Sequence, residues 1–258
     1  MAAGVRVLAG DARILPGIDA ESVHLVVTSP PYPMIPQWDA LFAGQGATDF
    51  DSMHDLLGAA WCACHRVLVP GGILAVNVGD ALRSSGPGSF RLWPNHGEVL
   101  RRAEAAGFRP LPYALWRKPM NRPNAYLGSG FLPPNAYITL DCEFLLLFRK
   151  GGLRVFPRGD PRRAESRMSR AERDEWFSQV WTVRAASQAG AAGRRTGRFP
   201  EEIPRRLIRM FSVVGDTVLD PFAGTGTTLR VARELGRDSI GVEIDPELAR
   251  DLDRAFTP

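Results

Sequence analysis

Short apolar segments alternate with longer amphipathic ones along most of the chain, and this alternation limits the fold more than any other feature of the sequence. Each apolar segment has the length and composition of a buried strand. Most of them are separated by helical patterns, and a strand–helix–strand succession is typical of a parallel sheet with helices on both faces. The expected strands are Val5–Ala9, Val23–Ser29, Ile73–Val78, Arg109–Trp116, Glu143–Arg149, Thr217–Asp220 and Ser239–Ile244.

Three helices are expected between these strands. The pattern of Asp51–Leu68 gathers apolar residues on one stripe and ends at Pro70-Gly71-Gly72, a second helix runs from a capping Asn95 to Gly107, and a third spans Thr227–Leu235. No helical pattern separates the fourth and fifth strands, which suits an antiparallel pair at one sheet edge. The sequence therefore predicts an α/β fold, a Rossmann-like, doubly wound sheet of seven mostly parallel strands with an antiparallel edge pair.

The size and charge of the chain narrow the class of protein. A length of 258 residues with 45% hydrophobic content is compatible with a single domain over residues 1–258. No stretch approaches the roughly 20 apolar residues that span a bilayer, and the N-terminus lacks a signal-peptide pattern, so we expect a cytoplasmic protein without membrane association. The net charge is +4 and nearly all cations are arginines. Arginine suits a nucleic-acid partner, although a coding bias toward arginine would give the same composition.

The cysteines are too few for a disulfide framework. Cys62-Ala63-Cys64-His65 contains the residue types of a metal cluster. However, Cys64 falls on the apolar stripe of the expected helix, which indicates a small core residue. We therefore expect no metal site.

Two long regions break the alternation of strands and helices. Residues 117–140 are rich in proline and asparagine, and residues 151–198 are rich in arginine and include a flexible glycine- and alanine-containing stretch. Irregular segments of this length are usually functional or disordered, so each is a candidate for contacting a large substrate.

A glycine-rich turn follows the strand that ends at Asp220. The residues Pro221-Phe222-Ala223-Gly224-Thr225-Gly226 lead into the helix that opens at Thr227-Thr228. Glycines let a backbone approach a ligand closely, and the helix start offers free amide donors. A Walker loop needs a lysine that is absent, and the third glycine of a dinucleotide-binding loop is replaced by Arg230 or Thr227. A nucleoside without a pyrophosphate remains, and S-adenosylmethionine is its common example.

Three carboxylates stand where such a ligand would need them. Glu243 ends the next strand, in the place of a ribose acceptor, and a solvated strand end is the less favoured alternative. Asp220 could accept from the ammonium of the methionine part. Asp11 follows the first strand and could take the adenine amino group, although an aspartate after a glycine is also a common turn residue.

The stretch Thr28-Ser29-Pro30-Pro31-Tyr32 directly follows an apolar strand. The Ser29 hydroxyl and the Pro30 carbonyl can accept from the two N–H bonds of an amine on an electron-poor ring, which frees its lone pair for attack on a sulfonium methyl. Pro31 fixes the backbone so that the Pro30 carbonyl points in one direction, and Tyr32 offers a face for base stacking. Two prolines are also an ordinary way to end a strand.

Together these motifs resemble the amino-directed DNA methyltransferases of the beta arrangement, in which an S/D/N-P-P-Y motif precedes an F-x-G-x-G motif. The resemblance covers almost the whole chain and implies an S-adenosylmethionine-dependent methyltransferase fold in which the catalytic and cofactor strands are neighbours. It implies catalytic roles for Ser29, Pro30, Pro31 and Tyr32. It implies cofactor contacts for Asp11, Ala12, Thr28, Phe199, Pro200, Asp220, Pro221, Phe222, Ala223, Gly224, Gly226, Thr227, Thr228, Glu243 and Ile244.

The resemblance also implies a substrate. A base inside double-stranded DNA must be swung out of the helix, and residues 33–50 with Trp38 and Phe42 could close over it or simply pack on the core. Ser29 at the first motif position favours cytosine-N4 over adenine-N6 as the acceptor. Target recognition is expected in residues 151–198, with 117–140 contributing, and cofactor binding in residues 199–258.

Other readings stay open at this stage. An amine in RNA or on a protein glutamine is a second acceptor class, which the arginine-bearing regions disfavour. A DNA-binding module without chemistry would be expected to have a damaged motif, and both motifs are intact. The sequence leaves open the DNA site, a companion restriction endonuclease and the oligomeric state.

Overall fold

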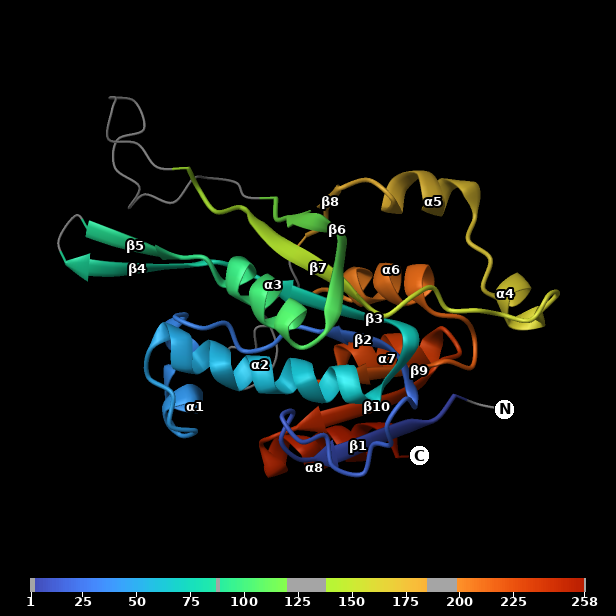
Figure 1. The fold of residues 1–258 in the computed structure, drawn as a ribbon, viewed down its shortest axis with the longest axis horizontal. Helices are drawn as coiled ribbons and strands as arrows, with labels where there is room; N and C mark the ends of the chain where they lie inside the picture. Colours follow the sequence, from blue (N-terminus) through green and yellow to red (C-terminus); the bar gives the residue numbers. More distant parts are fainter. Residues whose placement is uncertain (1–2, 87–88, 120–137, 185–198, 258) are drawn as a thin grey trace.

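A computed structural model describes residues 3–86, 89–119, 138–184 and 199–257 (Figure 1). The large sheet contains eight of the strands, in the order β1-β10-β9-β2-β3-β7-β6-β8. Its strands are β1 (Val5–Ala9), β2 (Val23–Thr28), β3 (Leu68–Val78), β6 (Phe108–Arg117), β7 (Cys142–Lys150), β8 (Val180–Thr182), β9 (Thr217–Asp220) and β10 (Asp238–Glu243). Only β7 runs against its neighbours among these strands, so the expectation of a mostly parallel α/β sheet is confirmed.

The expected strand count of seven was wrong. The three residues of β8 pair in parallel with β6 and form the sheet edge, so the antiparallel pair of β6 and β7 lies one strand inside it. A second sheet is formed by the hairpin of β4 (Ala81–Gly86) and β5 (Ser89–Trp93). β8 is only three residues long, and the hairpin strands mix apolar with polar residues, so neither has the sequence signal of a buried strand.

Helices cover both faces of the large sheet. They are α2 (Phe50–Val67) and α3 (Asn95–Ala105) on one face, and α6 (Glu202–Phe211), α7 (Thr227–Glu234) and α8 (Pro246–Phe256) on the other. Shorter elements are the 3-10 helix η1 (Pro36–Trp38) and the helices α1 (Asp39–Ala43), α4 (Pro161–Glu165) and α5 (Arg170–Trp176).

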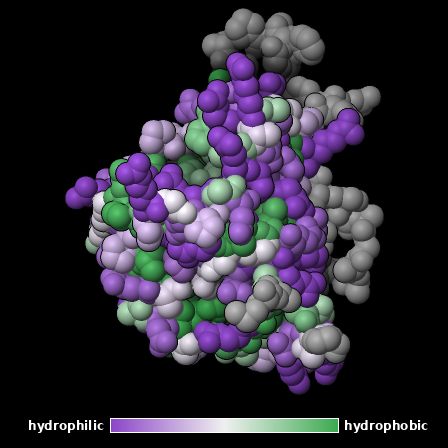
Figure 2. All heavy atoms as spheres, turned by 90° about the vertical axis from the view of Figure 1, so that its right-hand side faces the viewer, coloured by the Kyte–Doolittle hydropathy of each residue, from purple (hydrophilic) through white to green (hydrophobic). Residues whose placement is uncertain are grey.

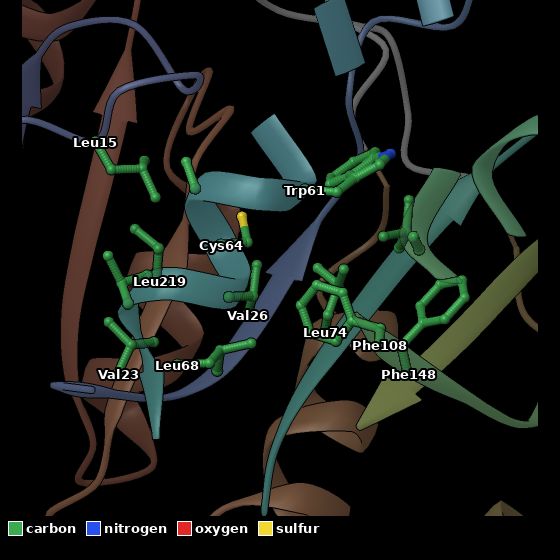
Figure 3. Packing of buried hydrophobic residues seen from close by; sticks show 14 of the residues in the cluster. Leu15, Val23, Val26, Trp61, Cys64, Leu68, Leu74, Phe108, Phe148 and Leu219 are labelled. Atoms are coloured by element: carbon green, nitrogen blue, oxygen red, sulfur yellow. The ribbon is translucent and has the colours of Figure 1, made fainter. Parts of the chain in front are cut away.

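Alternate residues of β2 form the two halves of the core. Val26 faces α2, where Trp61 and Cys64 are fully buried (Figure 3). Leu25 and Val27 face α6 and α7. This strict alternation, with both faces apolar, is what a central strand covered on two sides requires.

The strand order reverses between β9 and β2. The chain leaves β9 through α7 to β10 on one side, and it leaves β2 through α2 to β3 on the other. In parallel sheets of this kind, the crevice at the carboxyl ends of the strands next to such a reversal is where ligands bind. The reversal therefore brings the end of β2 and the end of β9 together, although they are far apart in the sequence.

Candidate active site

A cavity of about 470 Å³ lies at the carboxyl ends of β1, β10, β9 and β2. Ser29 and Pro31 line it from the segment after β2, and Gly224 lines it from the turn after β9. The two motifs are therefore parts of one site. Its other lining residues are Gly10, Asp11, Ala12, Arg13, Gln37, Trp38, Leu41, Phe42, Gln45, Leu56, Leu57, Ala60, Phe199, Asp220, Pro221, Phe222, Ala223, Thr225, Thr227, Glu243, Ile244, Asp245 and Leu248.

The glycine-rich turn has backbone conformations that require glycine. Gly224 and Gly226 have φ angles of +50° and +76°, and Gly226 immediately precedes α7. A Cβ atom on Gly226 would lie 2.4 Å from Cδ1 of Leu252 in α8. The turn is thus pressed against α8 on one side, and its other side faces the cavity. The Thr227 hydroxyl is buried beside the cavity without a hydrogen-bond partner among the described residues, so it is available to a ligand.

Asp220 is buried at the end of β9. Its Oδ1 accepts from the Thr28 hydroxyl at 2.7 Å and from the Phe222 amide at 3.1 Å. Burial raises the pKa of this carboxyl to about 6, and these hydrogen bonds only partly oppose the shift. Within the described residues, no cationic partner stabilises the charge of this group.

The other two carboxylates are held in place by the protein. Glu243 accepts from the Gly224 amide at 2.9 Å and from the Asp245 amide at 3.0 Å, which ties β10 to the glycine-rich turn. Asp11 binds the guanidinium of Arg13 through both oxygens, and this hydrogen bonding holds the Asp11 pKa below its ordinary value. Both carboxylates line the cavity.

The segment after β2 is fixed at both of its ends. Thr28 is buried against Asp220, as described above. Tyr32 does not line the cavity; its hydroxyl lies 3.0 Å from the Ser29 Oγ and donates to Glu143 Oε2 at 2.9 Å. The Asn95 amide donates to the Pro33 carbonyl at 3.0 Å. Ser29 is therefore held between a buried strand end and an anchored tyrosine.

Comparisons with known proteins identify the family. The family model for DNA methylases of the N6/N4 type matches residues 23–254. The chain belongs to this DNA methylase family. The Type II methyltransferase M.MjaI of Methanocaldococcus jannaschii is 52% identical over 267 residues, which cover 94% of this chain and 88% of the relative.

Solved structures agree with this assignment. A protein of Thermus thermophilus, described as a DNA modification methylase and complexed with S-adenosyl-L-methionine, matches with a TM-score of 0.78 and 36% identity over 98% of this chain and 94% of its own. The PvuII DNA methyltransferase, named as cytosine-N4-specific, matches with a TM-score of 0.74 over 100% of this chain and 88% of its own. Its identity of 19% shows the fold alone. The expected methyltransferase fold is confirmed.

Most of the residues expected to bind cofactor in this DNA methylase line the cavity. The exceptions are Thr28, Pro200, Gly226 and Thr228, each of which is next to a lining residue in the sequence. Of the expected catalytic residues, Pro30 and Tyr32 do not line it. The roles of all these residues remain predictions that their positions support.

Several lining residues carry no signal in the sequence. Arg13 lies two residues after Asp11 and pairs with it, and Leu248 lies on α8. Trp38 and Phe42, which were expected either to close over the substrate or to pack on the core, do line the cavity, and Phe42 is also buried against Met34 and Met53. Arg13 and Leu248 reach the cavity through tertiary packing, because no motif spacing marks them.

The arginine-rich region of the methylase lies mostly away from the cavity. Helices α4 and α5 lie at the amino-terminal edge of the sheet, opposite the β4–β5 hairpin (Figure 1), and Arg154 pairs there with the buried Asp216. Figure 2 shows this face as largely hydrophilic. Residues 183–184 follow the carboxyl end of β8, which points to the same side of the sheet as the carboxyl ends that line the cavity, whereas 185–198 lie outside the described residues. So do residues 120–137 of the region 117–140.

Two further observations concern the part of the chain that the structure describes. None of its helices is long and apolar enough to cross a membrane. Within the same residues, no group of three or more His, Cys, Asp or Glu side chains is arranged to hold a metal ion.

Proposed function

We propose that this methylase transfers a methyl group from S-adenosylmethionine to the exocyclic N4 amine of cytosine at a specific site in double-stranded DNA. The observation that carries the proposal is that Ser29 and Gly224 line one cavity. An acceptor for the amine and a cradle for the methyl donor are therefore neighbours, as in-line transfer requires.

The cavity fits the proposed cofactor. The buried Asp220 has no cationic partner among the described residues, and the ammonium of the methionine part would supply one. Glu243 is held at the end of β10, where it can accept from ribose hydroxyls, and the unpartnered Thr227 hydroxyl offers a further hydrogen bond. Bound there, S-adenosylmethionine would supply an electrophilic methyl group on a sulfonium.

The chain's own residues would prepare the amine. The Ser29 hydroxyl and the Pro30 carbonyl accept its two N–H bonds, so that the nitrogen lone pair leaves the conjugation of the ring and points at the methyl group. No strong base is needed, since an N-methylated ammonium loses its proton readily. The base reaches this position by leaving the duplex, at a cost of a few kcal/mol, and the half-buried Tyr32 ring offers a surface for stacking.

The remaining assignments follow from this reaction. We propose one catalytic domain over residues 1–258, with target recognition in residues 151–198, a contribution from 117–140, and cofactor binding in residues 199–258. Because Arg184 is exposed after the carboxyl end of β8 and Phe199 lines the cavity, we propose that DNA is contacted by the chain between these two residues and not by α4 and α5. A cytoplasmic enzyme with a companion restriction endonuclease fits relatives that are Type II methyltransferases.

A single reaction tests the acceptor. DNA, RNA and protein pools are incubated separately with the enzyme and labelled S-adenosylmethionine, and labelled nucleic acid is digested to nucleosides. We expect label in DNA as N4-methylcytosine, and its loss in Ser29→Ala. N6-methyladenine as the sole product would establish the alternative base, and label confined to RNA or protein would reject DNA as the substrate. Sequencing a methylated plasmid library at base resolution then identifies the site.

A further inference from the structure

The Tyr32 hydroxyl belongs to a partly buried polar cluster that includes the cavity-lining Ser29. It lies 2.8 Å from Nδ2 of Asn77 on β3 and 2.9 Å from Oε2 of Glu143 on β7. The same Asn77 amide donates to Glu143 at 2.7 Å, and Lys118 forms an ion pair with the other oxygen of Glu143. Ser29 Oγ is the third neighbour of the tyrosine oxygen, at 3.0 Å. Residues of β3 and β7 and of the segments that follow β2 and β6 thus form one connected group of hydrogen bonds.

The direction of these hydrogen bonds follows from counting protons. Glu143 is paired with a lysine, so its carboxylate can only accept. The Asn77 amide nitrogen can only donate. The flipped amide is disfavoured, because its oxygen would then lie against the Glu143 carboxylate. The single proton of Tyr32 is therefore committed to Glu143, and burial together with the Glu143 charge raises the Tyr32 pKa so that this proton is retained. The contact between Tyr32 and Ser29 must then use the Ser29 proton.

We propose that Glu143 is a positioning residue that acts through Tyr32 to turn the Ser29 hydroxyl proton away from the cavity. Both lone pairs of Ser29 Oγ are then left to accept from the target amine, and the hydroxyl has no proton to offer against an N–H bond. This role is separate from base stacking by the Tyr32 ring. The inference rests on the proposed function, because it assigns the acceptor geometry of that same reaction.

Two substitutions separate this role from a structural one. Tyr32→Phe keeps the ring and removes the hydroxyl, so Ser29 loses its fixed orientation. Glu143→Gln brings in an amide that can donate to Tyr32, which lets the Tyr32 proton point at Ser29 and the Ser29 proton point at the amine. Glu143→Gln therefore reverses the direction of the hydrogen bond between Ser29 and Tyr32, whereas Tyr32→Phe only removes that hydrogen bond.

The kinetics of the two variants and their combination test the proposal. We expect kcat to fall about tenfold in Tyr32→Phe and further in Glu143→Gln, with KM for DNA and for S-adenosylmethionine within about twofold of wild type. The double variant has no tyrosine hydroxyl that could donate to Ser29, so the hydrogen bond cannot be reversed. Its kcat should therefore equal that of Tyr32→Phe and exceed that of Glu143→Gln. Merely structural damage would instead accumulate in the double variant.

The controls make each outcome informative. Glu21→Gln removes the carboxylate that pairs with Lys150, the only other lysine of the chain, and should leave kcat unchanged. If Glu143→Gln does not fold, Tyr32→Phe alone decides, because an unchanged kcat in that variant overturns the proposal. Additive losses, or a wild-type kcat in Glu143→Gln, overturn it as well. A wild-type enzyme that methylates no DNA would reject the proposed function instead.

Discussion

At the scale of single residues, Asp220 makes cofactor binding dependent on pH. Its pKa is raised to about 6 by burial, so the unliganded protein keeps the Asp220 carboxyl protonated at pH values where an ordinary aspartate is ionised. A raised carboxyl pKa favours the folded state fully below the unfolded value near 4, and this contribution is lost as pH rises through 6. The ionised form that accepts from an ammonium therefore becomes dominant only above about pH 6.

We expect the Kd for S-adenosylmethionine, measured by titration calorimetry, to fall up to about tenfold per pH unit between pH 5 and pH 6 and then to level off. Asp220→Asn should weaken binding at pH 7.5 and remove this pH dependence, whereas the exposed Asp19→Asn should leave both unchanged. A Kd in Asp220→Asn that keeps the wild-type slope would contradict this origin.

Asn95 shows how a correct local signal leads to a wrong role. An asparagine before a helical pattern is typical of an N-cap, but the cap of α3 is Pro94, and Asn95 is buried in the first turn. Its amide donates to the carbonyls of Pro33 and Gly79, and its oxygen lies 3.0 Å from Nε2 of His54. These partners are remote in the sequence, so local reasoning could not identify them.

The hydrogen bonds to these two carbonyls give Asn95 a measurable contribution to the free energy of unfolding. Asn95→Ala leaves them without that donor, and each unpaired buried group costs about 1–3 kcal/mol. We expect the free energy of unfolding to fall by about 2–5 kcal/mol in urea denaturation with an unchanged m-value. A loss below about 0.5 kcal/mol would mean that water replaces the amide.

At the scale of elements, β3 contains an irregularity that the sequence marks with glycines. The pairing with β2 shifts between Val23 and Leu25, and Pro70-Gly71-Gly72 fills the extra length. These residues were expected to end a helix before a strand, whereas they lie inside the strand. Gly71 has a φ of +81°, and a Cβ there would lie 2.4 Å from the Arg154 backbone nitrogen.

A pair of substitutions isolates that close contact. Gly17 also has a positive φ, of +68°, but a Cβ there would meet nothing within 4 Å. Gly17→Ala should cost only the backbone strain of about 1–2 kcal/mol. Gly71→Ala should cost a further 1–3 kcal/mol or so for the collision. Equal losses of unfolding free energy in the two variants would show that Arg154 moves aside freely.

The strands that could be predicted differ physically from those that could not. Runs such as Val23–Thr28 and Cys142–Lys150 are apolar because both faces of the sheet are covered there. The hairpin of β4 and β5 is stabilised by remote contacts instead, since Arg83 pairs with Asp39 and Trp93 packs on Phe50. Periodicity carries no information about contacts of that kind.

At the scale of the whole molecule, the cavity lies at the carboxyl ends of the parallel strands and not at their amino ends. Arg184 is exposed just after β8, on the side of the carboxyl ends of the parallel strands, and Arg158 is exposed near α4, on the side of their amino ends. If DNA lies across the carboxyl ends of the strands, Arg184→Ala should reduce the slope of the logarithm of the DNA-binding constant against the logarithm of salt concentration by about 0.9. Arg158→Ala should leave this slope unchanged. The reverse result, obtained by binding titrations at several salt concentrations, would place DNA on α4 and α5.

The same scale explains how much of the site could be predicted. Ser29 and Gly224 line one cavity because the carboxyl ends of the parallel strands lie on one side of the sheet, a rule that applies once the strands are recognised. Arg13 and Leu248 could not be foreseen, since they reach the cavity through a turn and a helix whose packing no motif records. The arrangement of the arginines at two edges was equally hidden, because charge content does not specify position.

The pairing of β1 at the outer edge of the sheet determines where the two ends of the chain lie. β1, near the start of the chain, pairs with β10 and packs against α8, near its end, so the two termini lie close together (Figure 1). A circular permutant that links them and opens the backbone before Phe199 would begin with the glycine-rich turn and finish with the serine half. The same sheet would still assemble, since strand neighbours do not depend on where a chain begins. The order of the two motifs is therefore a matter of connectivity, and the chemistry is indifferent to it.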